Sequence, residues 1–167
     1  MASWRRLDDA SAAEAGDLLR TCCGSTRWVE RMERRRPFGD QAALLSSAAE
    51  VWWGLGQDDW REAFAHHPRI GDRDALERRF ATTAHLSAAE QHGVEGARSE
   101  VLTALSEANR LYEETFGYIF IVCAHGRSAE EMLALLRDRL SNDPAVEIRV
   151  AASEQAAITR LRLNELR

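Results

Sequence analysis

The sequence contains no lysine, and all 22 of its basic residues are arginines. No side-chain amine is therefore available to form a Schiff base, which excludes pyridoxal phosphate chemistry and lysine-based carbonyl chemistry. The P-loop of nucleotide-binding proteins is also excluded, because its GxxxxGK[ST] motif needs a lysine and the ten glycines are scattered. The absence of lysine thus removes several classes of enzyme before any motif is considered.

The sequence also has few of the features that indicate a disulfide framework, secretion, membrane insertion or nucleic-acid binding. Only three cysteines are present, and Cys22 and Cys23 are adjacent, so we expect no disulfide framework. No apolar run approaches the roughly 20 residues that span a bilayer, and the N-terminus lacks the apolar stretch of a secretory signal. The net charge of −5 argues against a surface for nucleic acid or anionic membranes. These features predict a cytoplasmic protein.

Apolar residues recur along the chain with the 3.6-residue period of an α-helix, and no segment shows a sustained alternation of apolar and polar residues. Three Ser–Glu pairs have capping-box spacing: Ser11 with Glu14, Ser87 with Glu90, and Ser128 with Glu131. Asp143 followed by Pro144 is typical of a helix start. The expected helices cover about 11–22, 28–35, 41–55, 58–65 and 72–80, and further helices begin near 87, 128 and 144.

One segment, Phe116–Ala124, is ambiguous, because its bulky and β-branched residues suit either a strand or a buried helix. Repeats, linkers and low-complexity stretches are absent, and 45 % of the residues are hydrophobic. The sequence therefore predicts an all-α fold, a single compact domain of eight or nine helices over residues 1–167.

His67 is the first candidate for chemistry, because it lies directly before Pro68 in the loop HHPRIGD. Pro68 disfavours the α-helical region for His67, so the preceding helix must end there. The negative potential at a helix C-terminus should favour the charged form of the imidazole. The alternative is a helix-ending loop with a partly buried histidine and no chemical role.

Glu90 and Arg162 are candidates because helical periodicity turns both inward. Glu90 lies in line with Val94 and Ala97, and a buried carboxylate needs a partner or a raised pKa. Arg162 falls between Ile158 and Leu166, whereas Arg160 lies on the far, solvated side of the helix. The alternatives are a simple capping role for Glu90 and a structural ion pair for Arg162, with Glu90 as a possible partner.

The spacing of the histidines and cysteines does not favour a metal site, and the surroundings of Cys123 do not favour a catalytic thiol. The five histidines form no HxxxH or HExxH motif, and the cysteines form no CxxC motif, so we expect no metal site. Cys123 lies in an apolar run and is typical of a core residue. A metal-dependent hydrolase that uses the histidines remains an alternative function.

Four stretches in order resemble one family: HHPRIGD, LSAAEQHGV, NRLYEETFGYIFIVCAHGRSAEEMLALLRDRLSNDPAVE and ITRLRLNEL. They are similar to the 2-oxo-4-hydroxy-4-carboxy-5-ureidoimidazoline (OHCU) decarboxylases of purine catabolism. The set is specific, although each piece alone would be weak. The resemblance implies an all-helical carbon–carbon lyase that needs no cofactor, forms a homodimer, and yields (S)-allantoin and CO2. It also implies a functional link to urate oxidase and hydroxyisourate hydrolase.

The resemblance also assigns roles to residues. It implies that His67 and Glu90 are catalytic. We expect the Glu90 carboxylate to bind N–H groups of the substrate and so to determine which face of the ring receives the proton. The substrate-binding residues that it implies are Pro68, Ser87, Gln91, Arg162 and the segment Tyr118, Ile119, Phe120 and Ile121. The alternative from another class is a non-catalytic helical module that binds a purine-derived anion or a partner helix. Such a module would need no proton carrier at position 67.

Overall fold

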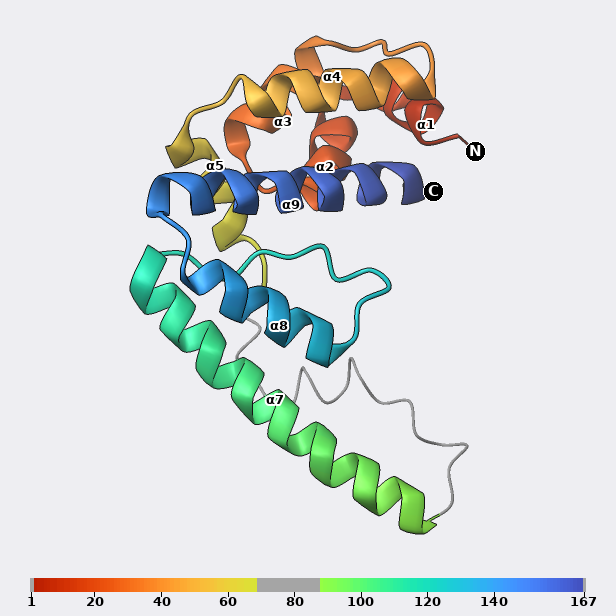
Figure 1. Ribbon diagram of the computed structural model, residues 1–167. Coiled ribbons are helices and arrows are strands. Elements are labelled where there is room, and N and C mark those ends of the chain that lie inside the picture. The colour runs from red at the N-terminus through yellow and green to blue at the C-terminus, as the bar shows by residue number, and fades with distance from the viewer. Residues whose placement is uncertain (1, 69–87, 167) are drawn as a thin grey trace. The chain divides into compact units, whose positions relative to one another are not determined.

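The computed structural model describes residues 2–68 and 88–166, and for residues 88–97 it describes the backbone alone. These residues form eight helices and no strand (Figure 1), which confirms the prediction of an all-α fold. The helices are α1 (Ser3–Asp9), α2 (Ala12–Cys22), α3 (Thr26–Arg34), α4 (Gln41–Trp53), α5 (Gln57–Ala65), α7 (Ala88–Phe116), α8 (Ala129–Leu140) and α9 (Pro144–Glu165). None of these helices combines the length and the apolar character needed to cross a membrane.

Helix starts agree with the capping signals in the sequence. Ser11 and Glu14 form a reciprocal capping box at α2, and Ser128 and Glu131 form another at α8. The side chain of Asp143 accepts the N–H of Ala145 at 2.8 Å at the start of α9. The third capping box, at Ser87, and the helix expected over 72–80 lie outside the described residues.

Helix α1 was not predicted, because its short sequence carries only a weak apolar pattern. Its buried residues are Ser3 and Leu7. The Ser3 hydroxyl donates to the carbonyls of Asn164 and Leu166, at 3.3 and 3.0 Å. These contacts join residues at opposite ends of the sequence, so a local reading of propensity does not reveal the helix.

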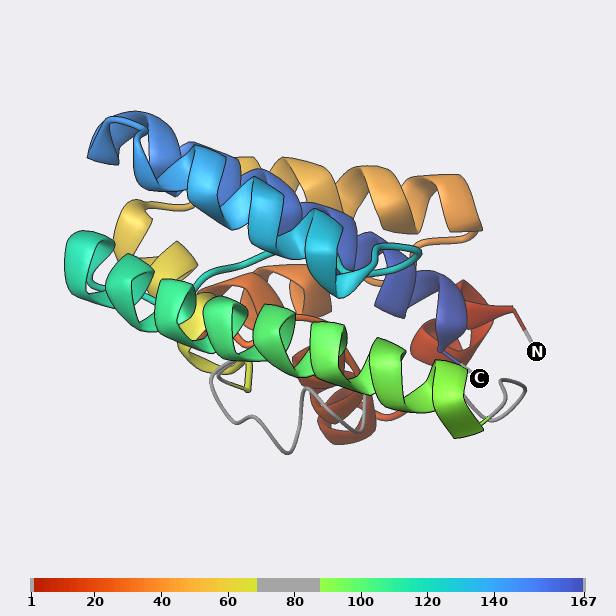
Figure 2. The same cartoon turned by 60° about the horizontal axis from the view of Figure 1, so that its bottom comes forward.

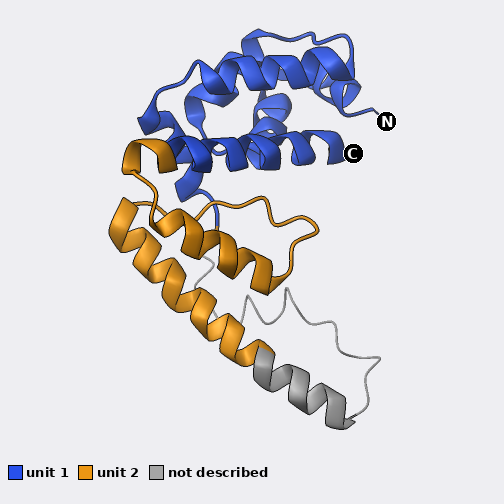
Figure 3. Cartoon of the chain, in the orientation of Figure 1, with its two compact units in different colours: residues 1–67, 148–167 blue, residues 68–147 orange. Residues whose placement is uncertain are grey.

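The chain forms two compact units (Figure 3), residues 1–67 with 148–167 and residues 68–147. The first unit contains α1 to α5 and most of α9, and the second contains α7 and α8. Helix α9 begins in the second unit and continues through the first. That all of these residues act as one domain stays a prediction.

In the first unit, α9 packs beside α4, and the two helices lie next to each other in both views (Figures 1 and 2). The Trp52 indole N–H donates to the carbonyl of Ala152 on α9 at 2.9 Å. The indole of Trp60 in turn donates to the carbonyl of Trp52 at 3.1 Å. Each large ring thus buries its apolar area and still satisfies its one donor. Both tryptophans pack in the core of the first unit.

In the second unit, the ambiguous segment is neither strand nor helix. Gly117 ends α7 with a φ of 80°, and its N–H donates to the carbonyl of Glu113 at 2.8 Å. A left-handed residue at this position is a common helix end, and glycine adopts it without strain. The following residues to Ala124 have no regular structure, although Tyr118, Phe120, Ile121 and Val122 are buried.

A buried ion pair between Arg139 and Glu147 holds the backbone of this segment, which has no neighbouring strand among the described residues. Arg139 donates to Glu147 Oε1 through Nε at 2.7 Å and to the carbonyl of Ile121 through Nη1 at 2.7 Å. Tyr112 and Asn142 also donate to the Glu147 carboxylate, at 2.5 and 2.8 Å. Burial raises the pKa of Tyr112, which keeps its phenol protonated as a donor. The cluster therefore anchors the backbone at Ile121 without a neighbouring strand.

This cluster predicts a large loss of stability for Arg139→Met. The substitution leaves Glu147, whose side chain is 0 % exposed, as a buried charge without its cation. Removal of one partner of a buried pair costs about 3–5 kcal/mol. Urea unfolding should show this loss, whereas Arg137→Met, at an exposed position of the same helix, should stay within about 0.5 kcal/mol of the parent. Equal midpoints for the two variants would contradict the role of the cluster.

Candidate functional site

His67 lies just past the C-terminal end of α5. The backbone N–H groups of His66 and His67 donate to the carbonyls of Ala63 and Phe64, at 3.3 and 3.1 Å, and so close the last turn. The prediction that the helix ends before Pro68 is confirmed. The His67 side chain is half-buried, whereas His66 and Pro68 are exposed.

Gln155 holds the imidazole of His67 from α9. The Nε2 atom of His67 lies 2.5 Å from Gln155 Oε1. Gln155 is 0 % exposed, and its amide nitrogen donates to Thr159 Oγ1 at 3.2 Å. Neither Gln155 nor Thr159 was predicted as a site residue. Their one signal in the sequence is that both lie toward the side of the helix that carries Arg162, because Gln155 precedes it by seven residues, about two turns, and Thr159 by three, about one turn.

Arg162 is exposed, so the prediction of a buried guanidinium was wrong. The buried face of this part of α9 runs through Gln155, Thr159 and Leu163, not through Ile158 and Leu166. Two of these three residues are polar, so a search for apolar periodicity misplaces the face.

The Arg162 guanidinium nevertheless has a fixed position at the end of α2. Its Nη1 lies 3.3 Å from the carbonyl of Thr21 and 3.5 Å from that of Cys22. A cation is favourable there because the last carbonyls of a helix carry partial negative charge. Arg162 also acts electrostatically on His67, which brings these two predicted residues into one neighbourhood within the first unit.

The pKa of His67 lies below the ordinary 6.5, which contradicts the expectation that its charged form is favoured. Burial of the ring is the largest cause, and the hydrogen bond to Gln155 opposes it. The positive charges of Arg162 and His66 lower the pKa further. Neutral His67 therefore contributes stability above pH 6.5, and this contribution is lost as the pH falls through the folded-state pKa.

The two adjacent thiols near Arg162 are unreactive by their electrostatics. Burial raises the pKa of Cys22 and that of Cys23 to about 11. Since the thiolate is the nucleophile, neither residue is activated at neutral pH. Both cysteines are buried in the core of the first unit. Cys123 is half-buried in the second unit.

The remaining predicted residues are placed only in part. Ser87 lies outside the described residues, and Glu90 and Gln91 lie in the first turn of α7, where the backbone alone is described. The segment Tyr118 to Ile121 belongs to the second unit, where Ile119 is half-buried and its neighbours are buried. The site is therefore built here on His67, Gln155 and Arg162. In the described ranges, no three His, Cys, Asp or Glu side chains are grouped closely enough to hold a metal ion.

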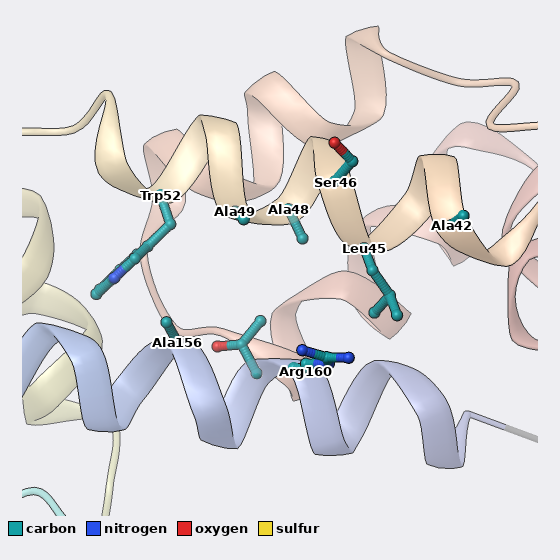
Figure 4. Close-up of a pocket in the computed structure, with 9 residues that line it drawn as sticks. Ala42, Leu45, Ser46, Ala48, Ala49, Trp52, Ala156 and Arg160 are labelled. Atoms are coloured by element: carbon teal, nitrogen blue, oxygen red, sulfur yellow. The ribbon is translucent and has the colours of Figure 1, made fainter.

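A cavity of about 520 Å³ lies between α4 and α9 (Figure 4). Its walls are mainly small or apolar, with Trp52 at one end and Arg160 near the other. Arg160 is exposed, as predicted. The cavity shares Thr159 with the hydrogen-bond chain of His67 but does not include His67 or Arg162.

Comparison with known proteins gives a consistent result. A sequence model of the OHCU decarboxylase family matches residues 8–164. The chain is 39 % identical over 158 residues to the uric acid degradation bifunctional protein TTL of Arabidopsis thaliana, covering 93 % of this chain and 48 % of that protein. The chain thus spans about half the length of this relative.

Two further relatives match over most of their own length. The 2-oxo-4-hydroxy-4-carboxy-5-ureidoimidazoline decarboxylase of Amia calva is 30 % identical over 131 residues, covering 78 % of this chain and 74 % of that protein. A crystal structure of OHCU decarboxylase in the presence of (S)-allantoin is 36 % identical, with a TM-score of 0.70 over 88 % of this chain and 94 % of that one.

The electrostatic effect of Arg162 on His67 predicts a pKa shift that can be measured without substrate. Because the charge of Arg162 lowers the pKa of His67, Arg162→Gln should raise it. Arg160→Gln removes the same charge two residues away and should leave it unchanged. NMR titration of the imidazole signals, assigned with a His67→Asn spectrum, measures both. An equal rise in the two variants would mean that only the net charge matters.

Proposed function

Because the chain belongs to the OHCU decarboxylase family, we propose that it converts OHCU to (S)-allantoin and CO2 in the degradation of urate. The observation that carries this proposal is the family match over residues 8–164, which includes both His67 and Arg162. A relative named for this reaction and a 36 % identical structure with (S)-allantoin support it. The short distance between His67 and Gln155 supports a fixed imidazole at the centre of the site.

The substrate supplies its own electron sink. It carries a hydroxyl and a carboxylate on one ring carbon, next to a ring carbon that is doubly bonded to nitrogen. Loss of CO2 moves the electrons of the broken bond toward this C=N bond and leaves an enol-like intermediate. The reaction is therefore that of a carbon–carbon lyase without an organic cofactor. The protein has to orient the carboxylate and deliver a proton to one face, and orientation can contribute up to about 7–11 kcal/mol.

In this proposal His67 moves a proton, and Arg162 binds and orients the substrate. The lowered pKa of His67 keeps its imidazole neutral at pH 7, so it accepts the hydroxyl proton of the enol-like intermediate. The exposed planar guanidinium of Arg162 binds the oxygen-rich anionic edge of the substrate. The carbonyls of Thr21 and Cys22 hold that guanidinium in place.

The other residues bind the rest of the substrate. Glu90 and Ser87 accept the ureido and ring N–H groups and so select the face that receives the proton, with Gln91 beside them. Pro68 shapes the loop at His67 by keeping the backbone of that residue extended. The segment 118–121 is proposed to bind the substrate through its backbone groups, and Arg139 anchors this segment at the carbonyl of Ile121.

We further propose that residues 1–167 act as one domain, that the protein is a cytoplasmic homodimer, and that it works with urate oxidase and hydroxyisourate hydrolase. The family match supports the single domain, because it extends through both units. The bifunctional relative in uric acid degradation supports the link to neighbouring steps. Light scattering of the purified protein measures the oligomeric state.

His67→Asn tests the proposed function. The substrate is generated with urate oxidase and hydroxyisourate hydrolase, and its rate of disappearance is followed. The variant should lose about two orders of magnitude in kcat or more, because a positioned acid–base group contributes that much, while its thermal midpoint stays close to that of the parent. His66→Asn is the matched control and should leave kcat nearly unchanged. A native protein that binds substrate without accelerating its loss would be a binding module.

A second prediction concerns metals and cofactors. Because the substrate carries its own electron sink, dialysis of the native protein against EDTA should leave kcat unchanged. The purified protein should also lack the absorbance of pyridoxal phosphate, since the chain has no lysine to hold it. Recovery of a lost activity with added zinc would favour a metal-dependent hydrolase instead.

A further inference from the structure

Gln155 is a fully buried amide whose contacts point to a role beyond packing. Its side chain is 0 % exposed, so each of its polar atoms needs a partner inside the protein. The Oε1 atom of Gln155 lies 2.5 Å from Nε2 of His67, and the amide nitrogen of Gln155 donates to Thr159 Oγ1 at 3.2 Å. The amide thus joins the imidazole to a buried hydroxyl one turn further along α9.

The neighbours of Gln155 fix the direction of this hydrogen-bond chain. The amide nitrogen of Gln155 donates to Thr159 Oγ1, and the hydroxyl oxygen accepts it. The amide oxygen accordingly faces His67, and an oxygen can only accept a hydrogen bond. His67 Nε2 must therefore carry a proton in the neutral ring.

We propose that Gln155 is a positioning residue that holds His67 in the tautomer with the proton on Nε2 and the lone pair on Nδ1. This inference rests on the proposed function, in which His67 moves a proton. It identifies Nδ1 as the atom that accepts the hydroxyl proton of the enol-like intermediate. The O–H electron pair becomes the C=O bond, the C=C pair takes up a proton from water at the neighbouring carbon, and the imidazolium returns its proton to the hydroxide that remains. The same hydrogen bond prevents the ring from turning over about the Cβ–Cγ bond, which would put ring carbons in the places of the two nitrogens.

The contact has consequences for the pH dependence that differ between two substitutions. The hydrogen bond to Gln155 raises the pKa of His67 against the effect of burial. Gln155→Leu removes it, so the pKa of His67 should fall further. Gln155→Glu keeps an acceptor at the same place and adds a negative charge, so the pKa should rise. The other charged groups that act on the ring are Arg162 and His66, and both substitutions leave them unchanged.

The first test uses the free protein labelled with ¹⁵N. In the parent, the ring nitrogens of His67 should show one tautomer, with the proton on Nε2. Gln155→Leu should give a mixture of tautomers, and Gln155→Glu should restore the single form. Gln57→Leu makes the same change at an exposed glutamine and is the matched control. A single unchanged tautomer in Gln155→Leu overturns the proposal.

The second test measures turnover and needs substrate. In Gln155→Leu, kcat should fall about ten- to a hundred-fold with little change in KM, the effect of losing one hydrogen bond to a group that becomes charged. Gln155→Glu should recover activity, with the acidic limb of its pH profile moved to higher pH. Should Gln155→Leu fail to fold, Gln155→Glu alone decides, because a merely structural role predicts no such shift.

The two tests separate the failure of this inference from that of the proposed function. In one outcome, the parent shows a single tautomer and Gln155→Leu shows a mixture, but the parent does not turn over OHCU. The proposed decarboxylase function is then wrong, and the role of Gln155 in orienting the ring is retained. A parent with full turnover and the same kcat in Gln155→Leu would keep the decarboxylase and remove the role of Gln155.

Discussion

The hydrogen bond between His67 and Gln155 joins two distant parts of the sequence, the end of α5 and the middle of α9, at a distance of 2.5 Å. Pro68 prevents the helix from continuing past His67, and the buried amide then determines where the ring points. The same side of α9 carries Arg162, whose guanidinium is held by carbonyls at the end of α2. The first unit therefore brings together His67 and Arg162, the proposed proton carrier and the proposed anion-binding group.

Burial of the ring and the nearby positive charge both lower the pKa of His67. Desolvation of the ring and the positive charge of Arg162 both disfavour imidazolium, so His67 stays neutral and able to accept a proton. A bound anionic substrate would neutralise part of the charge on Arg162 and so make protonation of His67 easier. In the proposed reaction, Arg162 would thus connect substrate binding with the basicity of His67.

Local signals in the sequence were sufficient for most of the fold. The capping boxes at Ser11 and Ser128 and the Asp143–Pro144 pair predicted the starts of α2, α8 and α9. These signals work because each involves residues within one turn. The segment after Phe116 could not be assigned in this way, since its backbone is held by Arg139, eighteen residues beyond Ile121 in the chain.

The positions of the candidate residues were predicted in part. The end of the helix before Pro68 is confirmed, whereas helical spacing placed Arg162 too deep, because both Arg162 and Arg160 are exposed. The roles of these residues in a site stay predictions. Gln155 was missed because a polar residue on a buried helix face is invisible to a search for apolar periodicity, and only its long-range contact with His67 reveals it. Residues 69–87 lie outside the described part of the chain, so the assignment of Ser87 rests on the resemblance alone.

The central claim is that a fixed site delivers a proton to one face of a planar intermediate, and the enantiomeric composition of allantoin tests it most directly. An intermediate protonated in free solution has no preferred face and must give equal amounts of both enantiomers. With urate, urate oxidase and hydroxyisourate hydrolase, addition of this protein should give an excess of (S)-allantoin, measured by circular dichroism or chiral chromatography. A racemic product at every protein concentration would contradict the account.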